Sequence, residues 1–438
     1  MTASRRLPGL GTLGRFHRDA RLFLLASLIS GAAISLWWID FNLYLQALGL
    51  ARATIGIVSV IASVAGTLTA FPASSLSDRV GRRTVLAGGA VAGLAALVLL
   101  LAAGDNLVVI VAAAGLWSAG FQAISVVTAP YMAEHSEPEH RNELFAVQFA
   151  IQNVTNIVAA VLGGVVAGAI AGALGFDPAG LATYRVIIGI MIVLMVIGLG
   201  TIALLRDDRP RTLQSPRLQK LGEPAAFPQD PRRGRARFGI VVRNRGRFIR
   251  LILPGFLIGV GAGQVIPFLN LFVQGRFGLD LAQLNGVFAV TSLGTVIAIL
   301  VQPRLARRFG QVTSVVIVQA CSIPFLVALG FSPILWTVIA AMAVRNALMN
   351  AGNPIFSAFA MEQVDKAERA TLAAATSVTW QIGWVFGGLF YSAMQAWLGF
   401  DLGYAVNFIG IIVLYTASTA LFGWWFRGAG RRAAAPVV

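Results

Sequence analysis

The sequence has little charge, little lysine and almost no cysteine. Only 12% of its 438 residues are charged and 57% are hydrophobic, whereas about 25% of the residues of a soluble protein are charged. The composition therefore excludes a soluble protein and predicts an integral membrane protein. The single cysteine, Cys321, excludes an intramolecular disulfide and a thiolate metal cluster. Neither Lys220 nor Lys366 follows a Gly-x-x-x-x-Gly run, so no ATP-binding loop is present, and we expect no cofactor and no metal.

Long apolar runs occupy most of the chain. Each predicted segment has about 20 residues or more, enough for a helix to cross a bilayer. The first run is too long for the core of a signal peptide, so no cleaved signal is expected. We predict an all-α membrane protein with twelve transmembrane helices, at residues 22–48, 54–74, 84–103, 107–133, 144–174, 184–205, 248–275, 281–302, 313–331, 333–361, 370–397 and 403–426.

Basic residues gather on alternate connections between these helices. Thirty of the 34 lysines and arginines fall in the two tails and the even-numbered connections, as is typical of cytoplasmic segments. We therefore expect both termini in the cytoplasm and a multi-pass protein of a prokaryotic inner (plasma) membrane. The net charge of +16 is then explained by attraction to anionic lipid, and no nucleic-acid partner is expected.

The composition also divides the chain into parts. A polar, basic stretch interrupts the apolar pattern near its middle, and the pattern then restarts. The predicted parts are a cytoplasmic tail (1–21), a six-helix bundle (22–205), a cytoplasmic linker rich in Arg and Pro (206–247), a second six-helix bundle (248–426) and a cytoplasmic C-terminal tail (427–438).

The two halves of the sequence repeat one another. Ser74-Ser-Leu-Ser-Asp-Arg-Val-Gly-Arg-Arg83, read as a charged hairpin after the second helix, has a weaker copy in Pro303-Arg-Leu-Ala-Arg-Arg-Phe-Gly-Gln311. Asn42-Leu-Tyr-Leu-Gln46 matches Asn270-Leu-Phe-Val-Gln274, 228 positions later. Six helices followed by six of the same orientation form a parallel repeat. Halves related in this way hold a solute between them near the midplane and rock to expose it to either side in turn.

At this point the chain resembles the major facilitator superfamily, whose signature between helices 2 and 3 is Gly-x-Leu-x-Asp-Arg-x-Gly-Arg-Arg. The resemblance covers nearly the whole chain. It implies a secondary transporter of two six-helix bundles related by a pseudo-two-fold, working as a monomer, with helices 1, 4, 7 and 10 lining the cavity. In the second copy Arg307 replaces the acid, which suggests a weaker latch. The matching residues are Leu76, Asp78, Arg79, Gly81, Arg82 and Arg83, with Ser74 at the leading glycine.

The same resemblance implies a cytoplasmic gate. Asp78 would face the N-terminus of the helix at 370–397 in the other bundle, where an acid gains about 0.3–1 kcal/mol. Arg79 or Arg82 would reach Glu134, and these contacts would break when the cytoplasmic side opens. Alternatively, the charges only anchor the segment to lipid headgroups. The predicted gate residues are Asp78, Arg79, Arg82, Arg83, Glu134, Arg141, Glu362 and Arg369.

Asp40 is the candidate proton carrier. It lies in the outer part of the first predicted helix, short of the membrane surface. An acid there costs about 2.5 kcal/mol or more unless it faces a cavity or a partner, and loss of water favours the protonated form of a carboxyl. The alternative is a hydrogen-bonded structural acid that never titrates.

Arg345 is the one base inside a predicted helix. It would pair with Asp40 or bind an anionic group of the substrate; alternatively, it caps carbonyls or extends toward the interface as a structural residue. Amide and aromatic side chains complete the predicted cavity, although buried amides also join helices. Besides Arg345, the predicted cavity residues are Asn42, Gln122, Gln152, Asn156, Gln264, Asn270, Asn346, Asn350 and Trp380.

Several functions fit these features. The leading hypothesis is a secondary active transporter of a small organic solute by alternating access, specifically proton-coupled export (antiport) of amphipathic compounds. The helix at 144–174 lacks the proline of the superfamily's antiporter motif, which argues against export. The first alternative is an importer or facilitator of a sugar or organic acid, with Arg345 holding a carboxylate. A sensor that signals through 206–247 is a second. No set of catalytic residues lies at membrane depth, so an enzyme is not expected.

Overall fold

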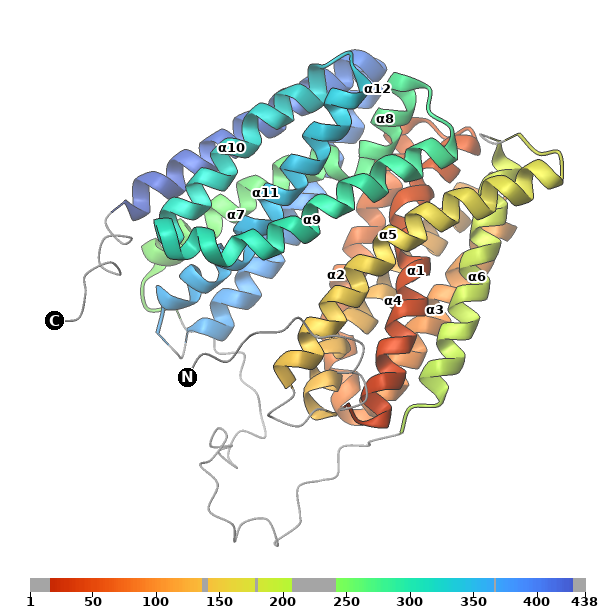
Figure 1. The fold of residues 1–438 in the computed structure, drawn as a ribbon, viewed down its shortest axis with the longest axis horizontal. Helices are drawn as coiled ribbons and strands as arrows, with labels where there is room; N and C mark the ends of the chain where they lie inside the picture. Colours follow the sequence, from red (N-terminus) through yellow and green to blue (C-terminus); the bar gives the residue numbers. More distant parts are fainter. Residues whose placement is uncertain (1–15, 136–140, 178–179, 207–241, 366–367, 428–438) are drawn as a thin grey trace, which may run out of the picture.

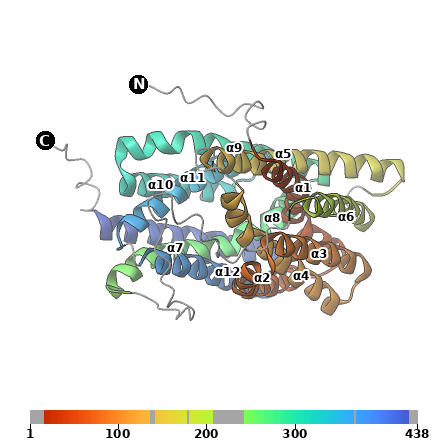
Figure 2. The same cartoon turned by 90° about the horizontal axis from the view of Figure 1, so that it is seen from below.

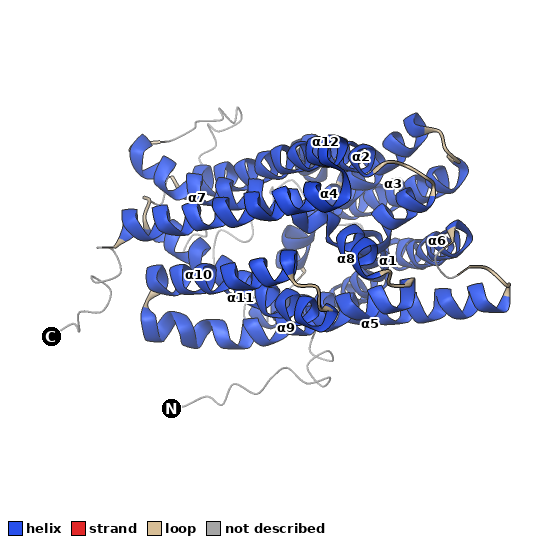
Figure 3. Cartoon of the chain, turned by 90° about the horizontal axis from the view of Figure 1, so that it is seen from above, coloured by secondary structure: helices blue, strands red, loops and turns tan. Residues whose placement is uncertain are grey.

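The computed structural model of the chain describes residues 16–135, 141–177, 180–206, 242–365 and 368–427. Nearly all of these residues are helical, and no strand occurs among them (Figure 3). The helices are α1 (Arg18–Ala47), α2 (Arg52–Val80), α3 (Arg82–Ala102), α4 (Leu107–Glu134), α5 (Arg141–Ala173), α6 (Leu181–Ala203), α7 (Arg245–Val265), η3 (Ile266–Phe268), α8 (Leu269–Phe277), α9 (Leu281–Phe309), α10 (Gln311–Phe331), α11 (Leu335–Glu362) and α12 (Arg369–Phe426).

The helices are long and apolar, as the hydropathy pattern predicts. In the described part of the chain, nine helices have the length and composition needed to cross a membrane, with α12 counted once. Many of their large apolar side chains point outward, including Leu68 and Val193, which are more than half exposed. Such a surface is unfavourable in water and suits contact with lipid, so the all-α membrane fold is confirmed.

The charged stretch at 74–83 is not a loop, in contrast to the sequence-based expectation. α2 continues to Val80, and α3 begins at Arg82. Nothing between 74 and 80 breaks the helix, so only Gly81 forms the turn, with a φ of 97° that favours glycine. The copy in the second half is likewise helical to Phe309 and turns at Gly310, where φ is 76°. The arginines of the first stretch therefore project from helix ends.

One predicted helix is interrupted, and one predicted connection between helices is very short. The predicted helix at 248–275 is divided into α7, η3 and α8, because Pro267 has no N–H to donate to the preceding turn. The predicted helices at 370–397 and 403–426 are two helices, as expected; they form the two segments of α12, which meet at Gly399. A φ of 70° at Gly399 reverses the chain direction within one residue, so no long loop is needed.

The chain folds into two halves that lie side by side, α1–α6 and α7–α12 (Figure 1). They meet along two helix pairs on opposite sides of the molecule, α2 with α12 and α5 with α9 (Figures 2 and 3). In the internal repeat α2 is equivalent to α9, and α5 to the first segment of α12. The two contacts are therefore equivalent, as the predicted pseudo-two-fold requires.

Two ends of the molecule can be distinguished by their contacts. Arg206 approaches Asp19 at 3.9 Å and Arg83 donates to the carbonyl of Ala203, so the start of α1, the start of α3 and the end of α6 share one end. In the second half, Arg247 donates to the carbonyl of Gln363, which joins the corresponding ends of α7 and α11. We call this arginine-rich end the basic side and the opposite end the far side.

Candidate functional site

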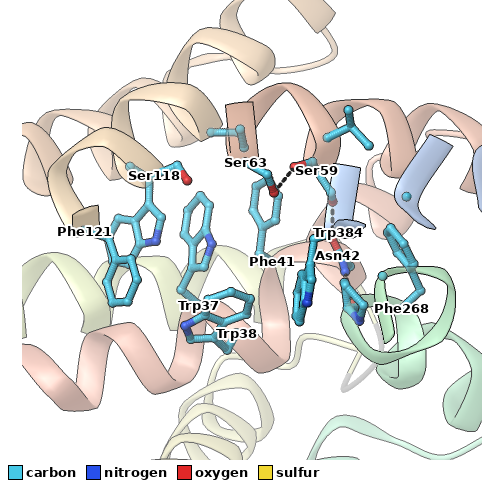
Figure 4. A pocket seen from close by; sticks show the side chains of 17 residues that line it. Trp37, Trp38, Phe41, Asn42, Ser59, Ser63, Ser118, Phe121, Phe268 and Trp384 are labelled. Atoms are coloured by element: carbon cyan, nitrogen blue, oxygen red, sulfur yellow. Dashed lines mark hydrogen bonds between the residues drawn. The ribbon is translucent and has the colours of Figure 1, made fainter. Parts of the chain in front are cut away.

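An aromatic cavity lies between the two halves (Figure 4). It measures about 90 Å³ and is lined by α1, α2 and α4 of the first half and by α7, η3 and α12 of the second. Its described lining holds seven aromatic side chains and no acidic or basic one. The labelled lining residues are Trp37, Trp38, Phe41, Asn42, Ser59, Ser63, Ser118, Phe121, Phe268 and Trp384. We call this space the interface cavity.

Stacked rings hold one wall of the interface cavity in place. The ring of Trp37 stacks on Phe41, one helical turn away, with centroids 4.0 Å apart, and on Trp117 of α4 at 4.4 Å. The opposite wall carries Trp384, whose buried indole Nε1 has no hydrogen-bond partner among the described residues. A buried donor without a partner is costly. The cavity thus offers flat apolar faces.

Two equivalent asparagines join the halves beside this cavity. Asn42 donates to the carbonyl of Pro267 at 2.6 Å, and Asn270 donates to the carbonyl of Ile39 at 2.6 Å. Asn42 and Asn270 are 228 positions apart in the sequence, and so are the two acceptors, Ile39 and Pro267. The two hydrogen bonds are therefore related by the pseudo-two-fold. Both side chains are buried. Asn42 and Asn270 were predicted as cavity residues, and the structure places them in the contact between the halves; Asn42 also lines the cavity.

Asp40 is buried on the other face of α1. Only 4% of it is exposed, and its Oδ1 accepts a bond of 3.4 Å from Asn285 of α9, in the opposite half. Its Oδ2 and the Oδ1 of Asn285 have no partner among the described residues. A small cavity of about 10 Å³ adjoins Asp40, and Trp37 and Phe41 line both this space and the interface cavity. Two rings therefore separate the acid from the interface cavity.

Arg345 does not meet Asp40, in contrast to one of the predicted alternatives. It is 7% exposed and donates to the hydroxyl of Tyr415 at 3.0 Å, within the second half. Its guanidinium also lies over the Tyr415 ring, 5.6 Å from the centroid. The reason is geometric: α1 is met by α8 and, through Asp40, by α9, whereas α11 packs against α9 and α10. Arg345 lines neither the interface cavity nor the space beside Asp40.

The remaining predicted cavity residues are dispersed. Asn156 accepts from Ser35 within the first half, and Asn350 donates to Asn346 within α11. Gln264 is buried against α12, with its Oε1 unpartnered among the described residues, while Trp380 lines a different cavity. Gln122 and Gln152 are not among the residues lining the interface cavity.

Sequence reasoning missed Asn285 and most of the aromatic lining. Asn285 is a single amide within an apolar run and has no counterpart in the repeat, since Ile57 stands 228 positions earlier. The aromatic residues did leave a signal in the sequence, although a weak one: Trp37 and Phe41 are four residues apart and therefore share a helix face. Their partner Trp117 belongs to another helix, and no local pattern connects the two.

The charged residues of the basic side make contacts within each half. Arg82 pairs with Glu134 at 2.7 Å, and both belong to the first half, so this contact does not join the halves and is present while the basic side is separate. Asp78 contacts Arg82 at 3.5 Å and has a side chain 67% exposed. In the second half, Glu362 accepts from Gln311. Arg79 and Arg369 are exposed, and the side chain of Arg141 lies outside the described residues.

The contacts that cross between the halves are on the far side or near the middle. Besides the asparagine pair and Asp40, Gln274 donates to Tyr184 at 3.2 Å and Arg52 lies over Phe400 at 4.5 Å. Among the described hydrogen bonds between the halves, the one nearest the basic side joins Gln381 and Thr67 at 3.4 Å. In the described part of the chain the halves are thus joined on the far side and separate on the basic side.

The sequence matches a known family over most of its length. Residues 23–388 match the profile of the Major Facilitator Superfamily. The chain belongs to this superfamily. Its members are transporters, so membrane transport of a small molecule is the general function of the chain. No curated protein matches it in sequence.

Solved structures of the superfamily share the fold. The nucleoside transporter NupG has a TM-score of 0.70 at 14% identity, with 93% of this chain and 99% of that chain covered. A bacterial homologue of the iron transporter ferroportin, in an inward-facing state, has a TM-score of 0.71 at 13% identity, covering 95% and 99%. A bacterial homologue of the human lysosomal transporter Spinster gives 0.69 at 13%, covering 93% and 96%. At such identities the likeness shows the fold alone.

Proposed function

We propose that this protein is a secondary active transporter that exports a small, uncharged, amphipathic solute by alternating access, in exchange for protons. The observation that carries the proposal is the interface cavity, whose described lining is aromatic, without charged side chains, and shared by both halves. Binding sites for small molecules combine apolar walls with a few polar groups. One chain supplies both walls, which supports a monomer as the functional unit.

The two bundles, 22–205 and 248–426, are the proposed moving units, and 206–247 is the proposed cytoplasmic linker, most of which lies outside the described residues. We place the basic side in the cytoplasm of a prokaryote, because thirty of the 34 basic residues are predicted on that side. The far-side contacts then correspond to an inward-open conformation. In this conformation the cytoplasmic latch is open, which agrees with the exposure of Asp78.

Burial and partner support Asp40 as the proton site. A carboxylate without a cation in a low-dielectric surrounding is unfavourable by several kcal/mol, and no ion pair to Asp40 occurs among the described residues. One proton on Asp40 would also satisfy the unpartnered oxygen of Asn285. Because Asn285 belongs to the other half, gain or loss of this proton would change how strongly the halves hold together.

Arg345 gives little support to the organic-acid alternative. An importer that binds a carboxylate needs a cation in its cavity, and the described lining of the interface cavity has none. Arg345 instead contacts Tyr415 inside the second half. We therefore assign Arg345 a structural role in the second bundle.

The test uses purified protein in proteoliposomes that contain a pH-sensitive dye, with a panel of neutral amphipathic solutes. We expect the wild type to couple solute flux to proton movement, and Asp40→Asn to lose gradient-driven transport while keeping solute exchange. Asp105→Asn is the matched control, since Asp105 is an exposed far-side acid. Gradient-driven accumulation in Asp40→Asn would refute the role of Asp40, and solute flux without proton movement would make the protein a facilitator.

A further inference from the structure

A second, larger cavity lies wholly within the second half, toward the basic side. It measures about 470 Å³ and is lined by α7, α10, α11 and α12. Met361 in the last turn of α11 and Ala373 in the second turn of α12 mark its position near the basic ends of these helices. It shares no lining residue with the interface cavity. Its volume falls within the range of about 300–1,000 Å³ that is typical of small-molecule sites.

The lining of this basic-side cavity has the same chemical character as the interface cavity. Its described residues include aromatic rings, Trp380 among them, and no acidic or basic side chain. Besides the indole N–H of Trp380, five neutral groups can form hydrogen bonds, among them the amides of Gln319 and Asn353 and the hydroxyl of Thr376. Gln319 is more than nine-tenths buried and accepts from Thr419 through its Oε1. Neutral polar groups among rings suit an uncharged aromatic solute, since a charged one would find no counter-charge.

Two tryptophans on α12 connect the cavities. Trp380 lines the basic-side cavity and Trp384 lines the interface cavity. They are one helical turn apart, and their ring centroids are 6.3 Å apart. Between the cavities α7 and α12 are in close contact, since a Cβ added to Gly383 would lie 2.9 Å from the backbone nitrogen of Val260. The helix backbones leave no space there, so Trp380 and Trp384 are the side chains that link the two linings along α12.

We infer that the basic-side cavity is a second binding site for neutral aromatic solutes, from which the solute passes along Trp380 and Trp384 to the interface cavity. As a step in transport this rests on the proposed function; as a binding site it does not. The main rival occupant is a lipid acyl chain. An acyl chain would cover the side chains of Asn353, Ser357 and Ser377, which have no hydrogen-bond partner among the described residues, and it would offer them none, so the lining favours a solute.

Benzophenone is a suitable probe, because it is a neutral aromatic ketone. On irradiation its carbonyl adds across nearby C–H bonds, with a preference for methionine side chains. Among the described residues, Met361 is the only methionine lining the basic-side cavity, and none lines the interface cavity. We expect saturable labelling of Met361 in the full-length purified protein, located by peptide mass spectrometry. Labelling of the peptide that contains Trp37 and Phe41 reports the interface cavity in the same sample.

Two substitutions fill the basic-side cavity from α12, Ala373→Trp and Ser377→Trp, so the test survives if one variant does not fold. Each should lower the apparent affinity of Met361 labelling by about tenfold or more, a loss of about 1.4 kcal/mol. Ala374→Trp is the matched control, since Ala374 is an exposed neighbour that does not line the cavity. Trp384→Ala should reduce labelling of the interface cavity and leave Met361 labelling unchanged.

The outcomes separate the binding site from the transport proposal. Non-saturable labelling of Met361, or labelling that survives both cavity-filling variants, would overturn the second site. Displacement of the label by phospholipid, but not by excess unlabelled neutral aromatic solute, would identify an acyl chain as the occupant and also overturn it. Saturable labelling without any solute flux would keep the site and refute the transporter. Normal flux in a filled variant would show that the site does not lie on the transport route.

Discussion

At the level of single residues, Asn42 and Asn270 are an equivalent pair that joins the two halves near the far side. Each donates one bond of 2.6 Å to the backbone of the opposite half. A hydrogen bond of this kind contributes about 0.5–1.5 kcal/mol net. Because both bonds join the two halves, we expect their loss to act on the conformational equilibrium rather than on the fold of either half.

We therefore expect Asn42→Ala or Asn270→Ala to shift the equilibrium toward the outward-open state by about 2- to 10-fold each, and the double variant further. Distances between spin labels at Ala51→Cys and Arg276→Cys, two exposed far-side positions, would measure the shift in a Cys321→Ser background. Asn350→Ala is the control, because the described hydrogen bonds of Asn350 stay within α11. An unchanged distance distribution in both single variants would contradict this role.

At the level of helices, the close approach of α7 and α12 holds the second half together. Gly263 and Gly387 face each other there, and a Cβ on Gly387 would lie 2.4 Å from the carbonyl oxygen of Val260 and 2.7 Å from Gly263. Small residues allow such close approach in membrane proteins. The neighbouring atoms belong to backbone, which cannot turn aside as a flexible side chain would.

Gly387→Ala should accordingly lower the stability of the protein by about 1–3 kcal/mol, the usual cost of overpacking. The midpoint of thermal unfolding in detergent would fall. Gly189→Ala in α6 provides the comparison, since a Cβ there meets no atom within 4 Å and alanine favours helix. Equal midpoints for the two variants would show that α7 and α12 can separate at no cost.

At the level of the whole molecule, Asp78 is the residue whose surroundings should change most during transport. Its side chain is 67% exposed on the basic side, where the described contacts stay within one half. If the basic side closes, Asp78 would meet the N-terminal end of α12, whose partial positive charge attracts an acid. Arg82 and Glu134 already form an ion pair inside the first half, so that pair cannot serve as the contact between halves.

Asp78→Asn should slow the transport cycle several-fold and leave equilibrium binding of the solute unchanged. Transport rates in proteoliposomes and binding to the purified protein would be measured side by side. Asp401→Asn is the control, as Asp401 is an exposed acid at the far-side kink of α12. A large loss of affinity at normal turnover would contradict a latch and place Asp78 in the binding of solute.

The sequence by itself determined that this chain is a helical membrane protein with an internal repeat. Hydropathy, the bias of arginines and the 228-residue offset each depend only on residue type and on spacing along the chain. Both can be read from the sequence, because a helix must be about 20 residues long to cross a membrane. It also indicated the Arg82–Glu134 contact. The superfamily signature places Arg82 at the start of the third helix, and Glu134 stands at the end of the fourth helix, on the same side of the membrane. The sequence-based prediction failed at Pro267, where a short 3-10 turn interrupts the helix predicted at 248–275.

Only the tertiary structure decided which polar groups meet. Asn42 and Pro267 are 225 residues apart, and Asp40 and Asn285 are 245 apart; no local pattern selects such partners. Arg345 was expected near Asp40 because both helices were assigned to one cavity, yet it contacts Tyr415. Which partner a buried polar group meets depends on the rotation of each helix about its axis and on which ends of the two halves are in contact. Those are properties of packing between helices, and for that reason they could not be inferred from residue spacing within one helix.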